Sequence, residues 1–198
     1  MRLFLAIDLD DAARAAIARE QKRMAAAIDR GEKALAWVAV DRMHLTLVFL
    51  GEVPDAPAAR LVEAMAAPIA RAPFAITFGG VDVFPPERAR KPPRILWIGL
   101  AEGAEQTAAV REAVAARATA AGATFDDRAF HPHLTLARWR RSVWSDRRRA
   151  AELARPGVIA RIAVDHVTLF QSRLSSAGPS YTALARANLF ASESADNR

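Results

Sequence analysis

The sequence predicts an α+β protein made of two similar lobes. Strands and helices follow each other without the regular alternation of a doubly wound parallel sheet, and each half of the chain contains two helices and several strands. The tetrapeptide His-Leu-Thr-Leu also occurs once in each half, at 44–47 and 133–136. We therefore expect two pseudo-twofold-related lobes, each with an antiparallel sheet and two helices, within one bilobal domain spanning residues 1–198.

Hydrophobic patterns locate the strands of both lobes. Short apolar or alternating runs that end at acids, glycines or prolines are typical of strands. We expect strands at residues 2–8, 43–51, 74–84, 94–100, 133–140, 161–171 and 181–189, with a short strand or turn beginning at 37. The pair Gly79-Gly80 predicts a bulge or bend within the third of these strands.

Four segments have the apolar spacing of amphipathic helices. They cover residues 10–30, 54–70, 102–121 and 144–154. In the first, apolar side chains recur along one face, and Asp10 and Asp11 stand where a helix N-terminus favours negative charge.

The composition excludes several classes of protein. The chain has 198 residues, 52% hydrophobic and 25% charged, unlike disordered or low-complexity sequences. It has no cysteine, which excludes disulfides, cysteine metal sites and thiol nucleophiles. No apolar run approaches the roughly 18 residues of a membrane span, and Asp8 interrupts the first run too early for a signal peptide. We expect a cytoplasmic protein without membrane contact, and a monomer.

The charge balance suggests an anionic partner. Lys and Arg number 28 against 22 Asp and Glu, a formal net charge of +6, and most of the basic residues are arginine. Arginine suits bidentate phosphate recognition, so a phosphorylated ligand or polyanion is one interpretation. The basic runs at 88–91 and 138–149 could then follow an RNA backbone. The alternative is a solvated basic surface in a protein from a GC-rich genome.

The repeated tetrapeptides place a histidine and a threonine on one face of each strand. Successive side chains of a strand point to opposite faces, so His44 and Thr46 point the same way, as do His133 and Thr135. The leucines between them, and Phe49, are then expected to face the core. If a pseudo-twofold axis relates the lobes, both His–Thr pairs can line one groove.

Two imidazoles and two hydroxyls favour phosphoryl-transfer or phosphodiester chemistry. Imidazole titrates near neutral pH, so one histidine can accept a proton while the other donates one. The threonine hydroxyls can donate hydrogen bonds to phosphate oxygens where negative charge accumulates. This chemistry requires no metal and no cofactor. The alternative is that the two histidines are unrelated, half-buried strand residues with local hydrogen bonds.

These motifs and their surroundings resemble a known family. The paired strings are similar to the H-x-T-x motifs of the two-histidine (2H) phosphoesterase superfamily. The flanking stretches resemble its bacterial and archaeal RNA 2′,3′-cyclic phosphodiesterases, historically called 2′-5′ RNA ligases. The similar stretches are MRLFLAIDL at the start, WVAVDRMHLTLVFLGEV at 37–53, FHPHLTLAR at 130–138 and LFQSRLSSAGPSYTALA at 169–185.

The resemblance implies a bilobal α+β fold with the active site in the groove between the lobes. It implies metal-independent hydrolysis of a terminal 2′,3′-cyclic phosphate to a 2′-phosphate. His44 resembles the proton donor to the 3′ oxygen, and His133 resembles the base that activates water. Thr46 and Thr135 resemble the phosphate-binding hydroxyls. The implied partners are RNA 3′ ends, such as tRNA-like fragments, or 2′,3′-cyclic nucleotides, with other nucleotides possible in the groove.

Four further residues flank these motifs or resemble site residues. Arg138 resembles a phosphate- or nucleotide-contacting arginine of the family, but strict alternation places it on the face opposite to Thr135, so this role requires a bulge or the end of the strand. Phe130 can stack on a nucleobase or pack in the core. His131 and His133 could form a metal pair, but no third ligand is evident. We expect His166 to be a hydrogen-bonded sheet residue or a neighbour of the groove.

Two rival functions remain at this point. The same site could ligate a 2′,3′-cyclic phosphate to a 5′-hydroxyl, since a ribose hydroxyl can replace water as the nucleophile. The chain could also be a non-catalytic module that binds RNA or nucleotides. The presence of both histidines and both threonines favours catalysis.

Overall fold

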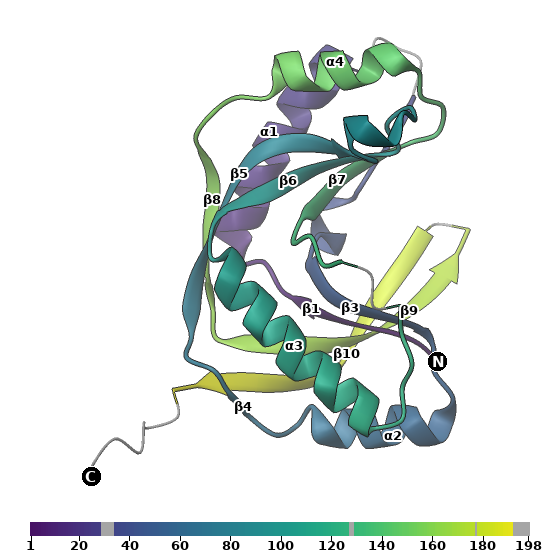
Figure 1. Ribbon diagram of the computed structural model, residues 1–198, viewed down its shortest axis with the longest axis vertical. Coiled ribbons are helices and arrows are strands. Elements are labelled where there is room, and N and C mark those ends of the chain that lie inside the picture. Colours follow the sequence, from purple (N-terminus) through teal and green to yellow (C-terminus); the bar gives the residue numbers. More distant parts are fainter. Residues whose placement is uncertain (29–33, 127–128, 177, 192–198) are drawn as a thin grey trace.

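The computed structural model describes residues 1–28, 34–126, 129–176 and 178–191, and these residues form two five-stranded sheets that face each other across an opening (Figure 1). One sheet contains strands from both ends of the chain and is called the terminal sheet. The other is built from the middle of the chain and is called the central sheet. Residues 29 and 30 of the first expected helix lie outside the described residues.

The terminal sheet has the order β3-β1-β9-β10-β4. Neighbouring strands are antiparallel except that β10 and β4 run parallel. Its strands are β1 (Arg2–Ile7), β3 (Leu45–Glu52), β4 (Ile69–Ala70), β9 (His166–Ser175) and β10 (Gly178–Phe190).

The central sheet has the order β2-β7-β6-β5-β8 and is antiparallel throughout. A register shift beside Gly79 and Gly80 confirms the expected irregularity. The strands are β2 (Leu35–Trp37), β5 (Phe74–Phe84), β6 (Ile95–Glu102), β7 (Leu134–Trp139) and β8 (Val158–Val164).

Two helices pack on each sheet, which confirms the predicted α+β fold with two lobes. The central sheet contacts α1 (Asp11–Ile28) and α4 (Trp144–Leu153). The terminal sheet contacts α2 (Asp55–Ala64) and α3 (Ala104–Ala120). Along the described chain, no helix combines the length and apolarity needed to cross a membrane.

The two lobes exchange helices. Helix α1 follows β1 of the terminal sheet but covers the central sheet, and α3 follows β6 of the central sheet but covers the terminal sheet. The strand order β3-β1-β9-β10 corresponds to β7-β6-β5-β8, so β3 and β7 hold equivalent places. The exchange connects the two lobes covalently and by packing, which fixes the position of β3 relative to β7.

Helix α1 is stabilised by a cap at its N-terminus and by a buried apolar face. The Asp10 carboxylate accepts a hydrogen bond from the Ala13 amide (2.7 Å) and so caps the helix. Ala13, Ile17 and Met24 are buried along one stripe, and this apolar face packs against the central sheet.

Two element predictions were wrong. The expected strand at 161–171 is two strands in different sheets, β8 and β9, separated at Asp165, whose carbonyl accepts a hydrogen bond from the Leu189 amide (2.7 Å). The expected helix at 54–70 ends at Ala64, and Ile69–Ala70 instead pairs with β10. Both errors arise because apolar periodicity within a segment does not specify which sheet the segment joins.

Candidate active site between the two sheets

A groove of about 390 Å³ separates the sheets at the two motifs. His44 and Thr46 line it from β3, and His133 and Thr135 line it from β7. The structure therefore brings together the four residues of the repeated motif, although 89 residues separate the copies in the sequence. The groove is also lined by Arg2, Phe4, Trp37, Phe49, Arg138 and Tyr181.

The two imidazoles are anchored in the same way. Nδ1 of His44 lies 2.9 Å from the Arg42 carbonyl oxygen, and Nδ1 of His133 lies 2.8 Å from the His131 carbonyl oxygen. Because a carbonyl can only accept, Nδ1 of each ring carries the proton. Nε2 is then unprotonated in the neutral ring and a donor in the charged ring. Each histidine can therefore act as a base or as an acid through Nε2.

Aromatic rings hold each imidazole in place. The His44 ring stacks on Phe4 (4.6 Å between centroids) and meets Tyr181 edge-on (5.2 Å). The His133 ring meets Phe84 and Trp97 edge-on, at 5.2 and 5.9 Å. These contacts restrict rotation of the rings and exclude water from their sides.

Burial lowers the pKa of both histidines, since it penalises the charged imidazole. The nearby charges differ between them. Asp8 favours the charged form of His44 while Arg14 opposes it. Arg138 and His131 both oppose the charged form of His133, so their charges lower its pKa further. Burial also raises the pKa of Tyr181, which keeps its phenol protonated.

The two threonines have free hydroxyls. Thr46 and Thr135 are half-buried and line the groove, and neither side chain has a hydrogen bond to another residue in the described ranges. A groove-facing hydroxyl with no protein partner is available to a ligand oxygen.

A β-bulge interrupts each motif strand at the same place. In β3, Thr46 pairs with Ala6 and Val48 pairs with Leu5, so Leu47 is the extra residue. In β7, Thr135 pairs with Trp97 and Ala137 pairs with Leu96, so the equivalent Leu136 is extra. A bulge advances the side-chain alternation by one residue.

The bulges change which side chains enter the groove. Arg138 is exposed and lines the groove. Strict alternation would place its side chain on the opposite face of β7, and the bulge at Leu136 brings it to the groove face. Phe49 was expected in the core, and this prediction was wrong. Its side chain is 50% exposed and lines the groove, with the Arg2 guanidinium 5.0 Å from the ring centroid.

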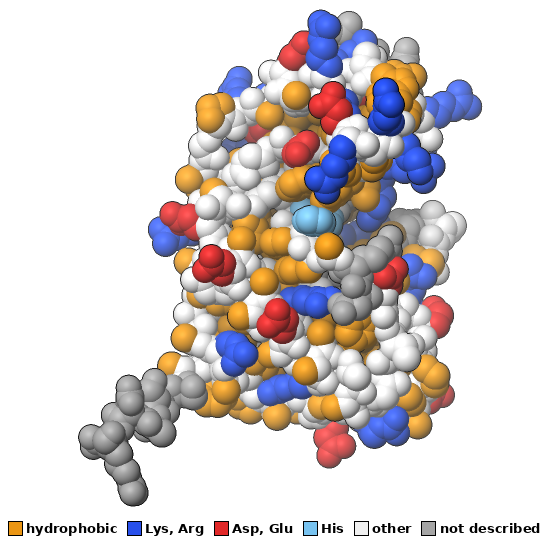
Figure 2. Space-filling view, in the orientation of Figure 1, with side chains coloured by type: hydrophobic (Ala, Val, Ile, Leu, Met, Phe, Trp, Pro, Cys, Tyr) orange, Lys and Arg blue, Asp and Glu red, His pale blue; other side chains and the backbone are white. Residues whose placement is uncertain are grey.

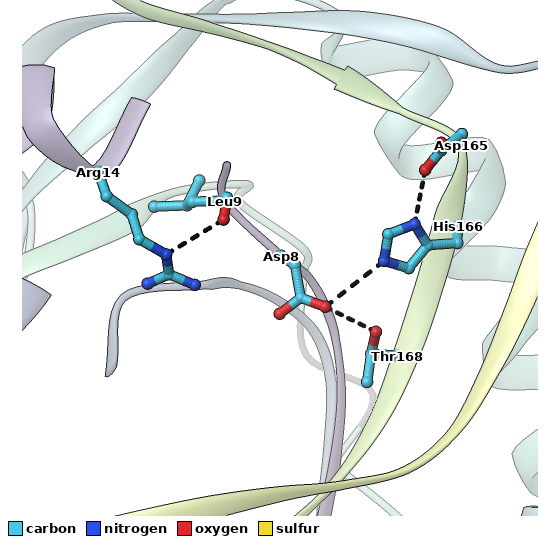
Figure 3. A network of polar contacts seen from close by, with 6 residues as sticks. All are labelled: Asp8, Leu9, Arg14, Asp165, His166 and Thr168. Atoms are coloured by element: carbon cyan, nitrogen blue, oxygen red, sulfur yellow. Dashed lines mark hydrogen bonds and ion pairs between the residues drawn. The ribbon is translucent and has the colours of Figure 1, made fainter. Parts of the chain in front are cut away.

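Helix α1 holds the segment that leads to His44. The Arg14 guanidinium donates to the carbonyls of Leu9 (3.1 Å), Val40 (2.8 Å) and Met43 (3.2 Å), and Figure 3 shows the bond to Leu9. Because Met43 directly precedes His44, Arg14 fixes the backbone from which that imidazole projects.

Gln21 connects the same segment to the second motif. Its side-chain amide donates to the carbonyl of Val38 (2.8 Å) and to that of Leu136 (3.1 Å), the bulged residue of β7. The Val38 amide also donates to the Leu136 carbonyl (2.9 Å). The carbonyl at the bulge therefore has two donors.

His166 belongs to a polar network at the junction of β8 and β9 (Figure 3). Its Nδ1 lies 2.5 Å from the Asp165 carboxylate, and its Nε2 lies 3.5 Å from Asp8. The Thr168 hydroxyl donates to the same Asp8 oxygen (2.7 Å). His166 is thus a hydrogen-bonded sheet residue, and the network holds Asp8, whose charge acts on His44.

The structure does not bring Phe130 to the groove. Phe130 is partly buried against the core, and the Arg111 guanidinium lies 5.9 Å from its ring centroid, so core packing accounts for it. His131 is exposed and supplies the carbonyl that anchors His133. Over the described ranges, no group of three or more His, Asp or Glu could hold a metal ion.

Sequence reasoning missed several groove residues. Phe49 was assigned to the core, while Arg2, Trp37 and Tyr181 received no role. Tyr181 comes from β10, and only the pairing of β10 with β9 brings it beside Ser172 at the groove. No local signal in the sequence identifies these residues, since their place depends on strand register.

Known proteins resemble this chain over most of its length. Residues 9–175 match the family model of the 2′-5′ RNA ligase superfamily. The RNA 2′,3′-cyclic phosphodiesterase of Escherichia coli is 30% identical over 185 residues, which cover 93% of this chain and 94% of the relative. A Geobacillus stearothermophilus protein of the same name is 41% identical over 103 residues, which are 52% of this chain and 32% of that protein.

Solved structures show the same fold. Apo E. coli LigT has 28% identity and a TM-score of 0.75, and the match covers 96% of this chain and 97% of LigT. Its complex with 3′-AMP has a TM-score of 0.72 at 27% identity, covering 95% and 97%. The sequence match and the structural match agree over nearly the whole chain, and the chain therefore belongs to the 2′-5′ RNA ligase superfamily, among relatives named RNA 2′,3′-cyclic phosphodiesterase.

Proposed function

We propose that this protein hydrolyses the 2′,3′-cyclic phosphate at an RNA 3′ end to a 2′-phosphate. The observation that carries this proposal is the matched anchoring of His44 and His133, which leaves Nε2 of each ring for a ligand in one groove. An acid and a base on opposite sides of one phosphate are what in-line displacement at phosphorus needs.

Each motif residue has a defined part in the reaction. His133 takes a proton from water as the water oxygen bonds to phosphorus. The bond from phosphorus to the 3′ oxygen breaks, and His44 gives its proton to that oxygen, leaving a 3′-hydroxyl and a 2′-phosphate. Thr46, Thr135 and Arg138 bind the non-bridging oxygens, on which negative charge accumulates.

The charges around His133 support this division of roles. Burial lowers both pKa values, and at His44 the Asp8 carboxylate favours the protonated ring that a proton donor requires while the Arg14 guanidinium opposes it. Arg138 and His131 favour a neutral His133, as a base requires.

The substrate class follows from the groove and from related proteins. E. coli LigT has been solved in complex with 3′-AMP, with NADP+ and with ATP. We propose that RNA 3′ ends, such as tRNA-like fragments, and 2′,3′-cyclic nucleotides bind here in the same way. The alternative reaction, 2′-5′ ligation, would open the same cyclic phosphate in the same groove with a 5′-hydroxyl in place of water as the nucleophile.

One assay tests the proposal. Purified protein is incubated in EDTA with an oligonucleotide that ends in a 2′,3′-cyclic phosphate, with and without a second oligonucleotide bearing a 5′-hydroxyl. We expect a 2′-phosphate product and no requirement for metal. A 3′-phosphate product would reverse the direction of ring opening, and a 2′-5′-linked product would favour ligation. Binding without turnover would favour a non-catalytic module, and activity that EDTA abolishes and a divalent ion restores would refute the metal-free mechanism.

A further inference from the structure

The face of the central sheet that carries Thr135 continues beyond the groove. In the register of the sheet, Thr135 of β7 pairs with Trp97 of β6, which pairs with Asp82 of β5. Directly paired residues point to the same face of a sheet. Trp97 and Asp82 therefore extend the groove face away from His133 and across the central sheet.

A second row of pairs leads in the same direction. Arg138 pairs with Ile95, and Ile95 pairs with Phe84. Since Arg138 lines the groove, Ile95 and Phe84 share its face. Both rows run from the motif strand to β5.

The β5 and β6 residues of these two rows line a second depression of about 560 Å³. Its lining includes Asp82, Phe84, Arg88, Arg94, Trp97 and His131. No residue of the repeated motif lines it, so it is a separate site beside the groove.

Its floor is aromatic and touches the catalytic ring. Phe84 stacks on Trp97, with centroids 4.8 Å apart and an interplanar angle of 18°. Both rings also contact the edge of His133. A Cβ at Gly99 would lie 3.1 Å from the Trp97 ring, so the glycine lets the indole lie along the sheet. Because the two rings cover each other, an unpaired nucleobase can stack only on the outer face of the pair.

Its rim is basic. Arg88 and Arg94 are exposed, and neither side chain forms a hydrogen bond or ion pair within the ranges that the structure describes. Both can therefore turn toward a phosphate. The rim also carries Asp82, whose carboxylate accepts a hydrogen bond from the Val83 amide (2.7 Å).

The two basic runs of the sequence meet beside this rim. Arg147 of α4 donates to the carbonyls of Pro85 (2.7 Å) and Lys91 (3.2 Å), which holds the 85–91 loop against the helix. Figure 2 shows Lys and Arg side chains gathered over this end of the molecule, with a histidine ring visible below them. Arg147 and the 88–91 tract, 56 residues apart at Lys91, thus lie side by side next to the depression, which only the 88–91 tract lines.

We propose that this depression binds the nucleotide that precedes the 3′-terminal nucleotide in single-stranded RNA. Its base stacks on the outer face of the Phe84–Trp97 pair, and its phosphate contacts Arg88 and Arg94, while the terminal cyclic phosphate lies between His44 and His133. The inference rests on the proposed function, because the groove must hold the 3′ end for the adjoining nucleotide to reach the depression. Its occupant is RNA because a stacking floor bordered by unpaired arginines complements a base and a phosphate together.

The test compares two substrates: cytidine 2′,3′-cyclic phosphate, which fills only the groove, and a short oligonucleotide with the same 3′ end. The test variant is Arg88→Gln/Arg94→Gln. The control variant, Arg19→Gln/Lys22→Gln, removes the same charge from the exposed side of α1. We expect KM for the oligonucleotide to rise about tenfold at low salt in the test variant only, and its salt slope to fall by about 0.7, for the one phosphate that the two arginines contact.

The kinetics of the cyclic mononucleotide should not change in either variant. If both variants raise KM for the oligonucleotide equally, the effect is one of overall charge and the inference is wrong. The inference is also wrong if neither variant raises KM for the oligonucleotide while the wild-type protein hydrolyses the mononucleotide. If wild-type protein hydrolyses neither substrate, the proposed function itself fails, and this inference fails with it.

A cross-linking measurement addresses the aromatic floor, because substitutions of Phe84 or Trp97 would disturb His133. The oligonucleotide carries 4-thiouridine at the penultimate position and ends in the product 2′-phosphate. We expect its cross-links to map to residues 82–97. Cross-links confined to the terminal sheet would place the penultimate base elsewhere and overturn the inference.

Discussion

Phe49 and Arg138 occupy equivalent positions in the two lobes, each five residues after its motif histidine and each turned into the groove by a bulge at the second leucine of the motif. Equivalent backbone positions in the two lobes thus place side chains of different chemistry on the two sides of the groove. The terminal sheet presents an aromatic ring beside Arg2, and the central sheet presents a cation.

Arg138→Ala is expected to raise KM for a 2′,3′-cyclic nucleotide roughly tenfold and to lower kcat, because a charge-assisted contact to phosphate is lost. Arg140→Ala is the matched control, since Arg140 lies two residues further along, is exposed and is absent from the groove lining. The measurement is KM and kcat of both variants for the 2′,3′-cyclic nucleotide under steady-state conditions. Equal effects would show that only net charge matters at this end of β7.

Phe49→Ala is expected to raise KM severalfold with little change in kcat, because we expect the exposed ring of Phe49 to contact the nucleoside rather than the phosphate. The fold should tolerate the change, since half of the side chain is already exposed. Thermal unfolding provides the control for stability. Unchanged KM for every cyclic nucleotide would mean that the ring contacts no substrate.

His44→Ala and His133→Ala are each expected to lower turnover by roughly 10²–10⁴, the range for loss of general acid or base catalysis. Both rings line the groove, and we expect the variants to remain folded. Turnover of a cyclic nucleotide is measured beside circular dichroism. A folded variant with near-wild-type turnover would remove that histidine from the mechanism.

The pH profile of kcat/KM is expected to be a bell centred below about pH 6.5, the ordinary pKa of histidine. Falling pH protonates His133 and disables the base; rising pH deprotonates His44 and disables the acid. Burial lowers the pKa of both groups, so both limbs move to lower pH. The two apparent values belong to the coupled pair.

A bound phosphate anion raises both histidine pKa values, so the kcat profile should be shifted to higher pH than that of kcat/KM. In the residual activity, His133→Ala should lose the acidic limb and His44→Ala the alkaline limb. The opposite pattern would exchange the two roles. Coincident kcat and kcat/KM profiles would mean that the substrate charge does not reach the imidazoles.

Gln21 is a positioning residue, because it touches neither imidazole but donates to the carbonyl at the bulge of β7. Gln21→Met removes both hydrogen bonds and should cost about 1 kcal/mol of unfolding free energy. It should also raise KM for the cyclic nucleotide, because the bulge that aims Arg138 loses a donor. Gln21→Lys keeps a hydrogen-bond donor, so its KM should lie between those of Gln21→Met and the wild-type protein. Lys22→Met, at the exposed neighbouring residue, should change neither KM nor the free energy of unfolding. Loss of stability with unchanged KM would limit Gln21 to a structural role.

The sequence by itself determined the local geometry of the motifs. Alternation along a strand is a property of the backbone, so His44 with Thr46, and His133 with Thr135, share faces wherever their strands lie. Composition and periodicity likewise determined the α+β class and the four helices. The repeat indicated that two equivalent strands exist.

Only the tertiary structure decided which strands pair with β3 and β7, and in which register. The bulges at Leu47 and Leu136 arise where β3 and β7 pair with their neighbours, and they moved Phe49 out of the core and Arg138 into the groove. The division of 161–171 between two sheets has the same origin. Strand partners and register depend on contacts between residues far apart in the chain, and a local pattern does not contain that information.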